Sequence, residues 1–259
     1  MPLASPESFA KDRLASLQEY SLLAGRAVAN MFSPPIYWAD IFTQMDSIGV
    51  GSLPIVILTG FFTGCVLALQ SETALQEFGA VSRTGSLVAL SMVKELGPVL
   101  TALMVSGRNA SGMASELGSM KVTEQIDAMR ALGTDPTRKL VTPRLVATVF
   151  MLFFLTIISD AVGIAGGALV SVAMLNLNAT AYIHSSYASL AYGNIVEGLT
   201  KAIFSGFIIA TVGCFYGMRT QGGTQGVGKA TTQAVVVSSV FIIVVDFLTS
   251  RLMISIFGS

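Results

Sequence analysis

Five charged residues stand in or near long apolar runs of the sequence: Lys94, Glu95, Asp160, Lys201 and Asp246. Charges inside a membrane are costly, so they are usually paired or face a polar cavity. The amines of Lys94 and Lys201 accompany one carboxylate, Glu95, and the net positive charge of the three suits a lipid phosphate. A structural Lys–Glu pair is the alternative. Asp246 fits a pair or hydrogen bond within a helix bundle, whereas Asp160 has no such explanation.

A second set of charges lies in residues 121–132, KVTEQIDAMRAL, between two apolar runs. Apolar and charged side chains alternate there with the period of a helix. Gly133 is placed to end this helix, and Asp135-Pro136 is typical of the start of the next one. The apolar stripe contains Val122, Ile126 and Met129, and the charged face contains Glu124, Asp127 and Arg130. A surface helix that only solvates its loop is the alternative interpretation.

Other patterns in the sequence argue against chemistry within this chain. Residues 223–230 nearly match the phosphate-binding loop GxxxxGK[ST], but Ala230 stands where the magnesium-binding hydroxyl is required. His184 is the only histidine, so a usual zinc site cannot form. Cys65 and Cys214 lie in apolar runs and make no disulfide framework. We therefore expect no metal site, no bound cofactor and no catalytic residues.

The composition is that of a membrane protein. Apolar residues make up 53% of the chain and charged residues 12%, with a mean hydropathy of +0.71. A bilayer core of about 30 Å needs about 20 apolar helical residues. Runs of about that length occur at about 53–70, 87–107, 145–175, 198–218 and 233–257. These runs predict an all-α membrane protein with five transmembrane helices. Acidic and basic residues number 15 each, so no electrostatic case for nucleic acid exists.

The N-terminal region has a different character. Residues 1–30 form a weaker amphipathic segment, and Pro34-Pro35 opens a stretch with aromatic residues. Trp38 and Phe42 in that stretch suit the membrane–water boundary, which predicts an interfacial elbow helix. We expect amphipathic and elbow helices in residues 1–52 and a five-span domain in residues 53–259.

The distribution of Lys and Arg sets the expected orientation. Residues 108–144 carry six Lys and Arg residues, whereas residues 71–86 carry only Arg83 and residues 176–196 carry none. The positive-inside rule therefore places the N-terminus and residues 108–144 in the cytoplasm. The second and fourth spans then enter from the opposite side. Lys94, Glu95 and Lys201 lie early in these two spans, so we expect them at similar depth toward the outer leaflet.

Small residues repeat at four-residue spacing within the spans. Such pairs let helix backbones approach closely in lipid, so tight helix packing is expected at each. The pairs are Gly60 and Gly64, Gly163 and Gly167, and Gly213 and Gly217.

The chain from about residue 36 to its end contains an ordered set of short motifs, which are 94–100 (KELGPVL), 107–108 (GR), 114–118 (ASELG), 120–128 (MKVTEQIDA), 135–136 (DP), 143–144 (PR), 228–236 (GKATTQAVV) and Asp246. In these motifs the chain resembles the MlaE family of ATP-binding-cassette (ABC) permeases, the membrane subunits of bacterial lipid-transport systems. The resemblance implies a homodimeric permease with an elbow helix and five spans per chain.

The resemblance also implies roles for both sets of charges. Residues 121–132 would be the coupling helix that seats in a groove of a cytoplasmic ABC ATPase subunit, which binds the ATP. The contact residues would be Glu124, Gln125, Asp127 and Arg130 as polar groups, with Ile126 and Met129 as apolar anchors. Lys94, Glu95 and Lys201 would line the lipid-binding cavity between two subunits, although Lys94 stands where relatives often have Arg.

Together these features predict a transport subunit without an ATPase site of its own, multi-pass in the bacterial inner membrane with a cytoplasmic N-terminus. It would move phospholipid between that membrane and a periplasmic lipid carrier with MCE domains. The alternative is an ion- or proton-coupled secondary transporter with Glu95, Asp160 and Asp246 as its relay. Against it, the sequence shows no internal repeat of the kind such folds usually have.

Overall fold

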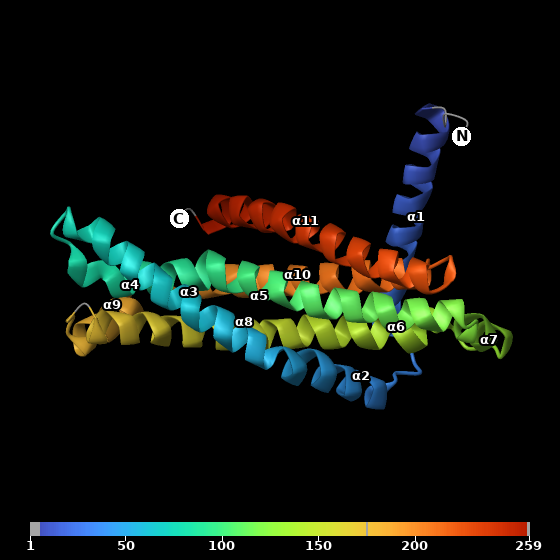
Figure 1. Cartoon of the computed structure of the whole chain (residues 1–259), viewed down its shortest axis with the longest axis horizontal. Helices are drawn as coiled ribbons and strands as arrows, with labels where there is room; N and C mark the ends of the chain where they lie inside the picture. The colour runs from blue at the N-terminus through green and yellow to red at the C-terminus, as the bar shows by residue number, and fades with distance from the viewer. Residues whose placement is uncertain (1–5, 175, 258–259) are drawn as a thin grey trace.

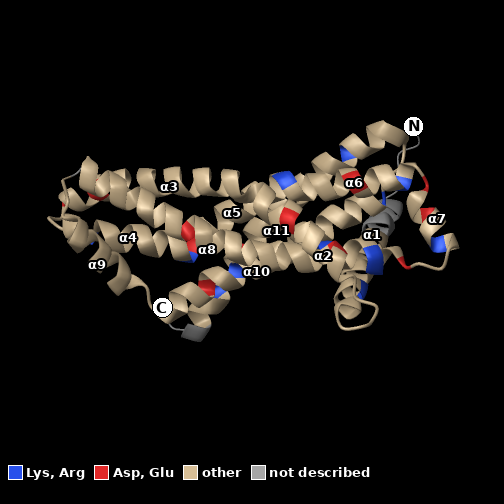
Figure 2. Ribbon diagram, turned by 90° about the horizontal axis from the view of Figure 1, so that it is seen from below, with Lys and Arg blue, Asp and Glu red and all other residues tan. Residues whose placement is uncertain are grey.

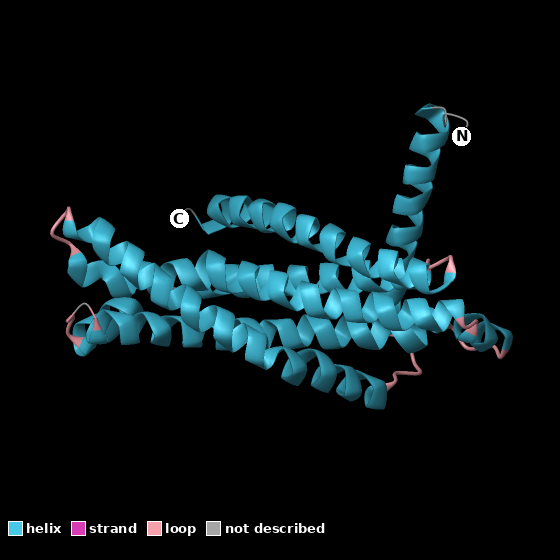
Figure 3. Ribbon diagram, in the orientation of Figure 1, coloured by secondary structure: helices cyan, strands magenta, loops and turns pink. Residues whose placement is uncertain are grey.

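The computed structural model describes the backbone of residues 6–174 and 176–257 and the side chains of residues 14–174 and 176–255, and this part of the chain is helical without strands (Figure 3). Five helical segments within it are long and apolar enough to cross a membrane. They are Trp38–Gln76, Val81–Val122, Thr137–Ala173, Tyr192–Met218 and Gly223–Ser255. Each contains one of the runs predicted from the sequence, apart from the last residues of two runs, so the five-span architecture is confirmed.

The spans lie side by side as one elongated bundle (Figure 1). The second segment is 42 residues long, which corresponds to about 60 Å of helix and exceeds a bilayer core of about 30 Å. It consists of α4 (Thr84–Ser91), α5 (Gly97–Val105) and α6 (Ser111–Val122), joined by π-helical turns at Met92–Leu96 and Ser106–Ala110. Its two ends therefore project beyond the apolar layer.

The entry into the bundle differs from the expected in-plane elbow. α2 (Trp38–Met45) continues through a π-helical turn at Asp46–Val50 into α3 (Gly51–Gln76), and the backbone stays right-handed helical at both junctions. The helix that crosses the bundle axis is α1 (Pro6–Met31), whose end lies just before Pro34-Pro35 (Figure 1). The predicted segment 1–30 is thus helical in its described part, while residues 1–5 lie outside the described residues.

Glycines form the contact between α3 and α8 (Thr142–Ala173). A Cβ on Gly64 would lie 1.8 Å from the Gly163 carbonyl oxygen, and one on Gly60 would lie 2.8 Å from that of Ser159. Gly213 on α10 (Tyr192–Met218) is close to the start of α6, where a Cβ would lie 3.1 Å from the Ala110 Cα of the preceding π-helical turn and 3.3 Å from the Met113 Cβ of α6. The predicted close packing at small residues is confirmed, and these contacts are made within the chain.

The two ends of the bundle carry short helices that do not span it. α7 (Gln125–Ala131) lies at one end, and many Lys, Arg, Asp and Glu residues gather there (Figure 2). α9 (Ala179–Ser189) lies at the other end, within residues 176–196, outside the predicted spans. Asn178 caps α9 by accepting the Thr180 N–H at 2.9 Å, and Ser186 donates to the Gly85 carbonyl of α4 at 3.1 Å. α11 (Gly223–Phe257) completes the bundle.

Replacing Gly64 with alanine tests the α3–α8 contact. The added methyl group meets backbone rather than a movable side chain, so the two helices must separate, and we expect a destabilisation of about 1–3 kcal/mol. Gly112→Ala is the matched control, because nothing lies within 4 Å of a Cβ on this helical glycine of α6. Thermal unfolding in detergent should show a lower Tm for Gly64→Ala alone, and equal Tm values would contradict the packing argument.

Candidate functional site

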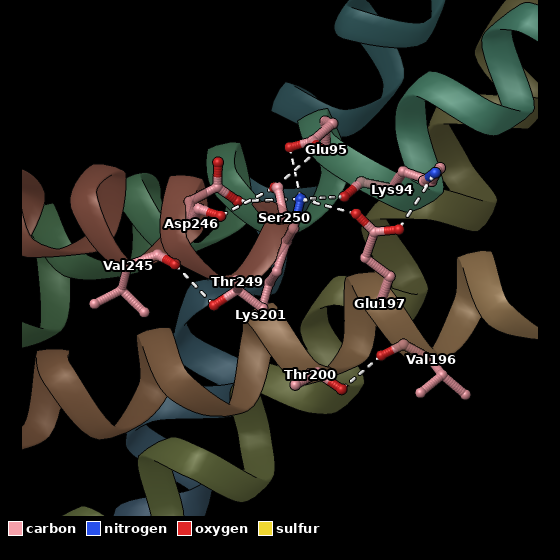
Figure 4. Close-up of polar contacts among 10 residues, drawn as sticks. All are labelled: Lys94, Glu95, Val196, Glu197, Thr200, Lys201, Val245, Asp246, Thr249 and Ser250. Atoms are coloured by element: carbon pink, nitrogen blue, oxygen red, sulfur yellow. Dashed lines mark hydrogen bonds and ion pairs between the residues drawn. The ribbon is translucent and has the colours of Figure 1, made fainter. Parts of the chain in front are cut away.

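The centre of the site is the ammonium group of Lys201 on α10, whose side chain is only 1% exposed. Its Nζ lies 2.6 Å from Glu95 Oε2 and 3.4 Å from Asp246 Oδ1, and it donates to the Lys94 carbonyl at 2.8 Å (Figure 4). Glu95 and Lys94 are on the π-helical turn Met92–Leu96, and Asp246 is on α11. One amine thus ties three of the spans together.

The sequence analysis missed one member of this site, Glu197. It lies on α10 one turn before Lys201, with its Oε1 3.7 Å from Lys201 Nζ and its Oε2 3.3 Å from Lys94 Nζ. Its side chain is 5% exposed. The carboxylate therefore bridges the two lysines, and the i,i+4 spacing to Lys201 was the available signal.

The predicted juxtaposition of Lys94, Glu95 and Lys201 is confirmed, but the predicted net positive charge is wrong. Glu197 and Asp246 join them, so two ammonium groups face three carboxylates and the formal balance is minus one. The Ser250 hydroxyl adds a polar contact, lying 3.2 Å from Glu95 Oε1. The expected role of Asp246 as a pairing residue is confirmed as well.

The charges of the cluster differ in their access to the outside. Lys201 and Glu197 are buried, whereas the side chain of Lys94 is 20% exposed and that of Glu95 is 46% exposed. A buried ion pair needs additional hydrogen bonds to offset its desolvation. Lys201 makes one by donating to the Lys94 carbonyl. The buried members therefore hold the cluster together, and Lys94 and Glu95 present charge at its edge.

Asp160 stands apart from this cluster. It lies on α8 against α5, where a Cβ on Gly97 would be only 1.6 Å from Asp160 Oδ1, so only glycine leaves room for the carboxylate. Among the described residues, no ion pair or hydrogen bond connects Asp160 to Glu95 or Asp246. The relay of three carboxylates that a secondary transporter would need is therefore not assembled.

The predicted coupling helix is present but shorter than residues 121–132. α6 ends at Val122, Glu124 adopts a left-handed conformation with φ of 60°, and α7 begins at Gln125. Gly133, with φ of 80°, ends α7 as predicted. The Thr134 N–H bonds to the Met129 carbonyl at 3.0 Å, which completes a Schellman cap. The predicted helix 121–132 is therefore interrupted near its first end, and only its part from Gln125 onward forms α7.

Ile126 is not an anchor for a partner. Its side chain is fully buried in the apolar cluster of this chain's own residues, with Leu117 of α6 and Leu145 of α8. Met129 is half-buried and packs against the same cluster. Ile126 and Met129 thus attach α7 to its own bundle. Val122, the third residue of the predicted stripe, is 38% exposed at the end of α6, and Leu132 after α7 is 84% exposed.

The charged face of α7 is exposed as predicted for Glu124, Gln125, Asp127 and Arg130. Asp127 receives hydrogen bonds from Lys121 Nζ at 2.7 Å and Arg130 Nη1 at 3.1 Å. The hydrogen bond from Lys121 and the charges of both cations lower the pKa of Asp127 from its ordinary value. These contacts therefore stabilise α7 above the ordinary pKa range of aspartate and are lost as the pH falls through the lowered value.

A further ion pair secures the same end of the bundle. Arg144 at the start of α8 is 7% exposed and donates from Nη2 to Glu116 Oε2 of α6 at 2.8 Å. Its Nη1 donates to the Leu140 carbonyl at 2.8 Å. The base to which α7 is attached is therefore fixed by both apolar packing and charge.

The fold and the site define the class of protein, a multi-pass α-helical membrane protein with a buried charge cluster between its spans. The sequence profile of the family "Permease MlaE" matches residues 41–252. A probable ABC transporter permease protein of Rickettsia typhi is 42% identical over 234 residues, 90% of each chain.

Two further relatives have more specific names. The protein TRIGALACTOSYLDIACYLGLYCEROL 1, chloroplastic, of Arabidopsis thaliana is 37% identical over 88% of this chain and 65% of its own length. The intermembrane phospholipid transport system permease protein MlaE of Haemophilus influenzae is 36% identical over 81% of each chain. The chain belongs to the MlaE permease family of ABC transporters, as the sequence resemblance indicated. Membership favours ABC transport over the ion-coupled alternative.

Replacing Lys201 with methionine tests the organisation of the cluster. The change leaves Glu95, Glu197 and Asp246 without their shared cation, and breaking a buried pair from one side costs about 3–5 kcal/mol. Lys229→Met on α11 is the control, because Lys229 is exposed and surface changes stay within about 0.5 kcal/mol. Thermal unfolding should separate the two variants; equal stability would show that the carboxylates do not depend on Lys201.

Proposed function

We propose that this permease moves phospholipid between the inner membrane and a periplasmic MCE-type lipid carrier, as a homodimer powered by a separate cytoplasmic ATPase subunit. The observation that carries the proposal is the cluster around Lys201, which places charge at its exposed edge within a membrane-spanning bundle. The printed function of the Haemophilus influenzae relative, intermembrane phospholipid transport, supports the same cargo. Membership in an ABC permease family implies work with an ATPase.

In this proposal the edge of the cluster contacts the lipid headgroup. Lys94 offers an ammonium group and Glu95 a carboxylate, and both are partly exposed. A phosphate group suits Lys94 as a point charge, and a headgroup amine suits Glu95. Lys201, which sequence reasoning assigned to direct contact, holds these neighbours in place because its ammonium group is already surrounded by carboxylates.

The exposed face of α7 contacts the ATPase in this proposal. Glu124 and Gln125 are exposed outside the buried stripe, and the exposed Leu132 supplies the apolar contact first assigned to Ile126. Arg130, first assigned to this face, lines a cavity between α7, α1 and α10. ATP hydrolysis in the partner would shift α7, and the packing of Ile126 would pass the movement to α6 and α8. The spans would then alternately open and squeeze the lipid cavity.

Replacing Lys94 with methionine should lower the phospholipid retained by the purified complex about ten-fold, because a hydrogen bond to a charged group contributes about 1.5–3 kcal/mol. Lipid phosphorus per protein is the measurement. Arg83→Gln is the control, since Arg83 is exposed on the short helical turn Val81–Arg83.

The double variant Lys94→Met with Glu197→Gln separates binding from folding. Lys94→Met alone leaves the buried Glu197 carboxylate without the ammonium group of Lys94. The second substitution removes that carboxylate, so the Tm of the double variant should exceed that of Lys94→Met while lipid retention stays low. A double variant that regains its lipid would show that Lys94 serves only the structure.

Reversing the charge of Glu124 to lysine should reduce the copurifying ATPase at least about ten-fold, since like charges placed across an interface cost several kcal/mol. Glu124 has no ion pair among the described residues, so the change leaves the Lys121–Asp127–Arg130 contacts intact. Glu77→Lys, exposed just after α3, is the charge-matched control.

Glu124→Gly distinguishes the carboxylate from the turn it occupies. Glycine adopts a φ of 60° without strain, so this variant can keep the turn geometry while it loses the side chain with its carboxylate. ATPase recovery from native membranes should fall for Lys and Gly alike. Full recovery of the ATPase with Glu124→Lys would contradict the assigned contact.

A further inference from the structure

A second group of charges surrounds a cavity of about 250 Å³ where α1, α10 and the α7 region meet. Arg26 of α1, Arg130 of α7 and Arg219, which follows α10, all line it. These three arginines come from distant parts of the chain, and neither the lipid cluster nor the fold of the spans uses Arg26. α1 meets the bundle at its α7 end (Figure 1), and the residues that line the cavity lie there.

The charge of this cavity is positive. Glu19 is the one carboxylate among its lining residues, and it pairs with Arg219 at 3.3 Å. Arg130 also pairs with Asp127, which does not line the cavity. Asp127 pairs with Lys121 as well, and the charges of Asp127 and Lys121 cancel each other. Arg26 has no carboxylate partner among the described residues. Three cations and one anion therefore leave two positive charges, which favour an anionic ligand.

The remaining walls of the cavity are largely apolar. Leu22 and Leu23 of α1 face Phe215 and Met218 of α10 across it. Arg219 lies over the Phe215 ring, 5.1 Å from its centroid, which keeps its guanidinium group at the cavity. Cations beside apolar walls fit a ligand that has an anionic group joined to an apolar body.

The position of α1 indicates where such a ligand comes from. α1 crosses the axis of the spans (Figure 1), so it runs along the surface of the membrane through which they pass. Leu14, Leu17 and Leu22 on it are 66%, 57% and 49% exposed, as expected for an interfacial helix whose apolar face enters lipid. Leu22 belongs both to this face and to the cavity wall, so the cavity opens toward lipid.

We propose that this cavity binds the headgroup of an anionic glycerophospholipid from the adjoining membrane leaflet. Basic pockets between membrane helices are suited to anionic lipid headgroups. The phosphate would lie among Arg26, Arg130 and Arg219, and the acyl chains would follow the apolar face of α1. A lipid held there contacts α1, α7 and α10 together, so it would fasten the ATPase-facing helix to the bundle. This site is separate from the cargo site at Lys94.

Native mass spectrometry of the purified full chain tests the proposal, with phosphatidylglycerol and phosphatidylcholine offered in equal amounts. The wild type should retain phosphatidylglycerol preferentially. Arg26→Gln should reduce that preference roughly five-fold, because a basic residue near the membrane surface contributes about 1 kcal/mol toward anionic lipid. Arg26 is chosen because its removal breaks no ion pair among the described residues.

Two controls make the result decisive. Arg83→Gln at the opposite end should keep the preference. Arg26→Lys should retain most of it, because it keeps the positive charge at this position. Equal preference in the wild type, Arg26→Gln and Arg83→Gln would overturn the proposal. Displacement of the lipid by inorganic phosphate, at matched ionic strength, would also overturn it by assigning the cavity to a soluble anion.

Discussion

The burial of the Lys201 ammonium group is the constraint on which the rest of the bundle depends. An unpaired ammonium group within a membrane would cost several kcal/mol, so α10 can occupy its position only when the carboxylates of Glu95 and Asp246 arrive beside it. That requirement sets the relative heights of α5, α10 and α11. The π-helical turn at Met92–Leu96 places Glu95 and the Lys94 carbonyl on the same amine, which gives this departure from α-helical geometry a physical reason.

Close packing at glycines joins helices that the charged cluster does not connect. Lipid surrounds the spans with material as apolar as leucine, so helices associate through close packing and polar contacts. The backbone of α3 approaches that of α8 at Gly64 and Gly163, whereas α6 meets α10 at Gly213. The glycine contacts therefore join α3 with α8 and α6 with α10, and the charged cluster adds α11. The glycine contacts and the charged cluster thus join different sets of helices.

The features predicted correctly from the sequence are those that a pattern within a single helix displays. Five apolar runs predicted five spans, and the positive-inside rule placed Lys94, Glu95 and Lys201 at one depth, where the structure joins them. The stripe through Ile126 and Met129 also shows which side chains share a face. It does not show whether that face meets its own chain or a partner, and here it meets its own. Glu197 was overlooked because it lies at the very start of its span, where polar residues are common.

The left-handed residue between α6 and α7 has a mechanical consequence. A single straight helix would continue from α6 into α7, but Glu124 interrupts it, and α7 is attached sideways through Ile126. Lys121 of α6 and Asp127 of α7 also form an ion pair across this break. A movement of α7 relative to α6 would therefore change side-chain contacts, while the hydrogen-bonded turns of both helices could stay intact.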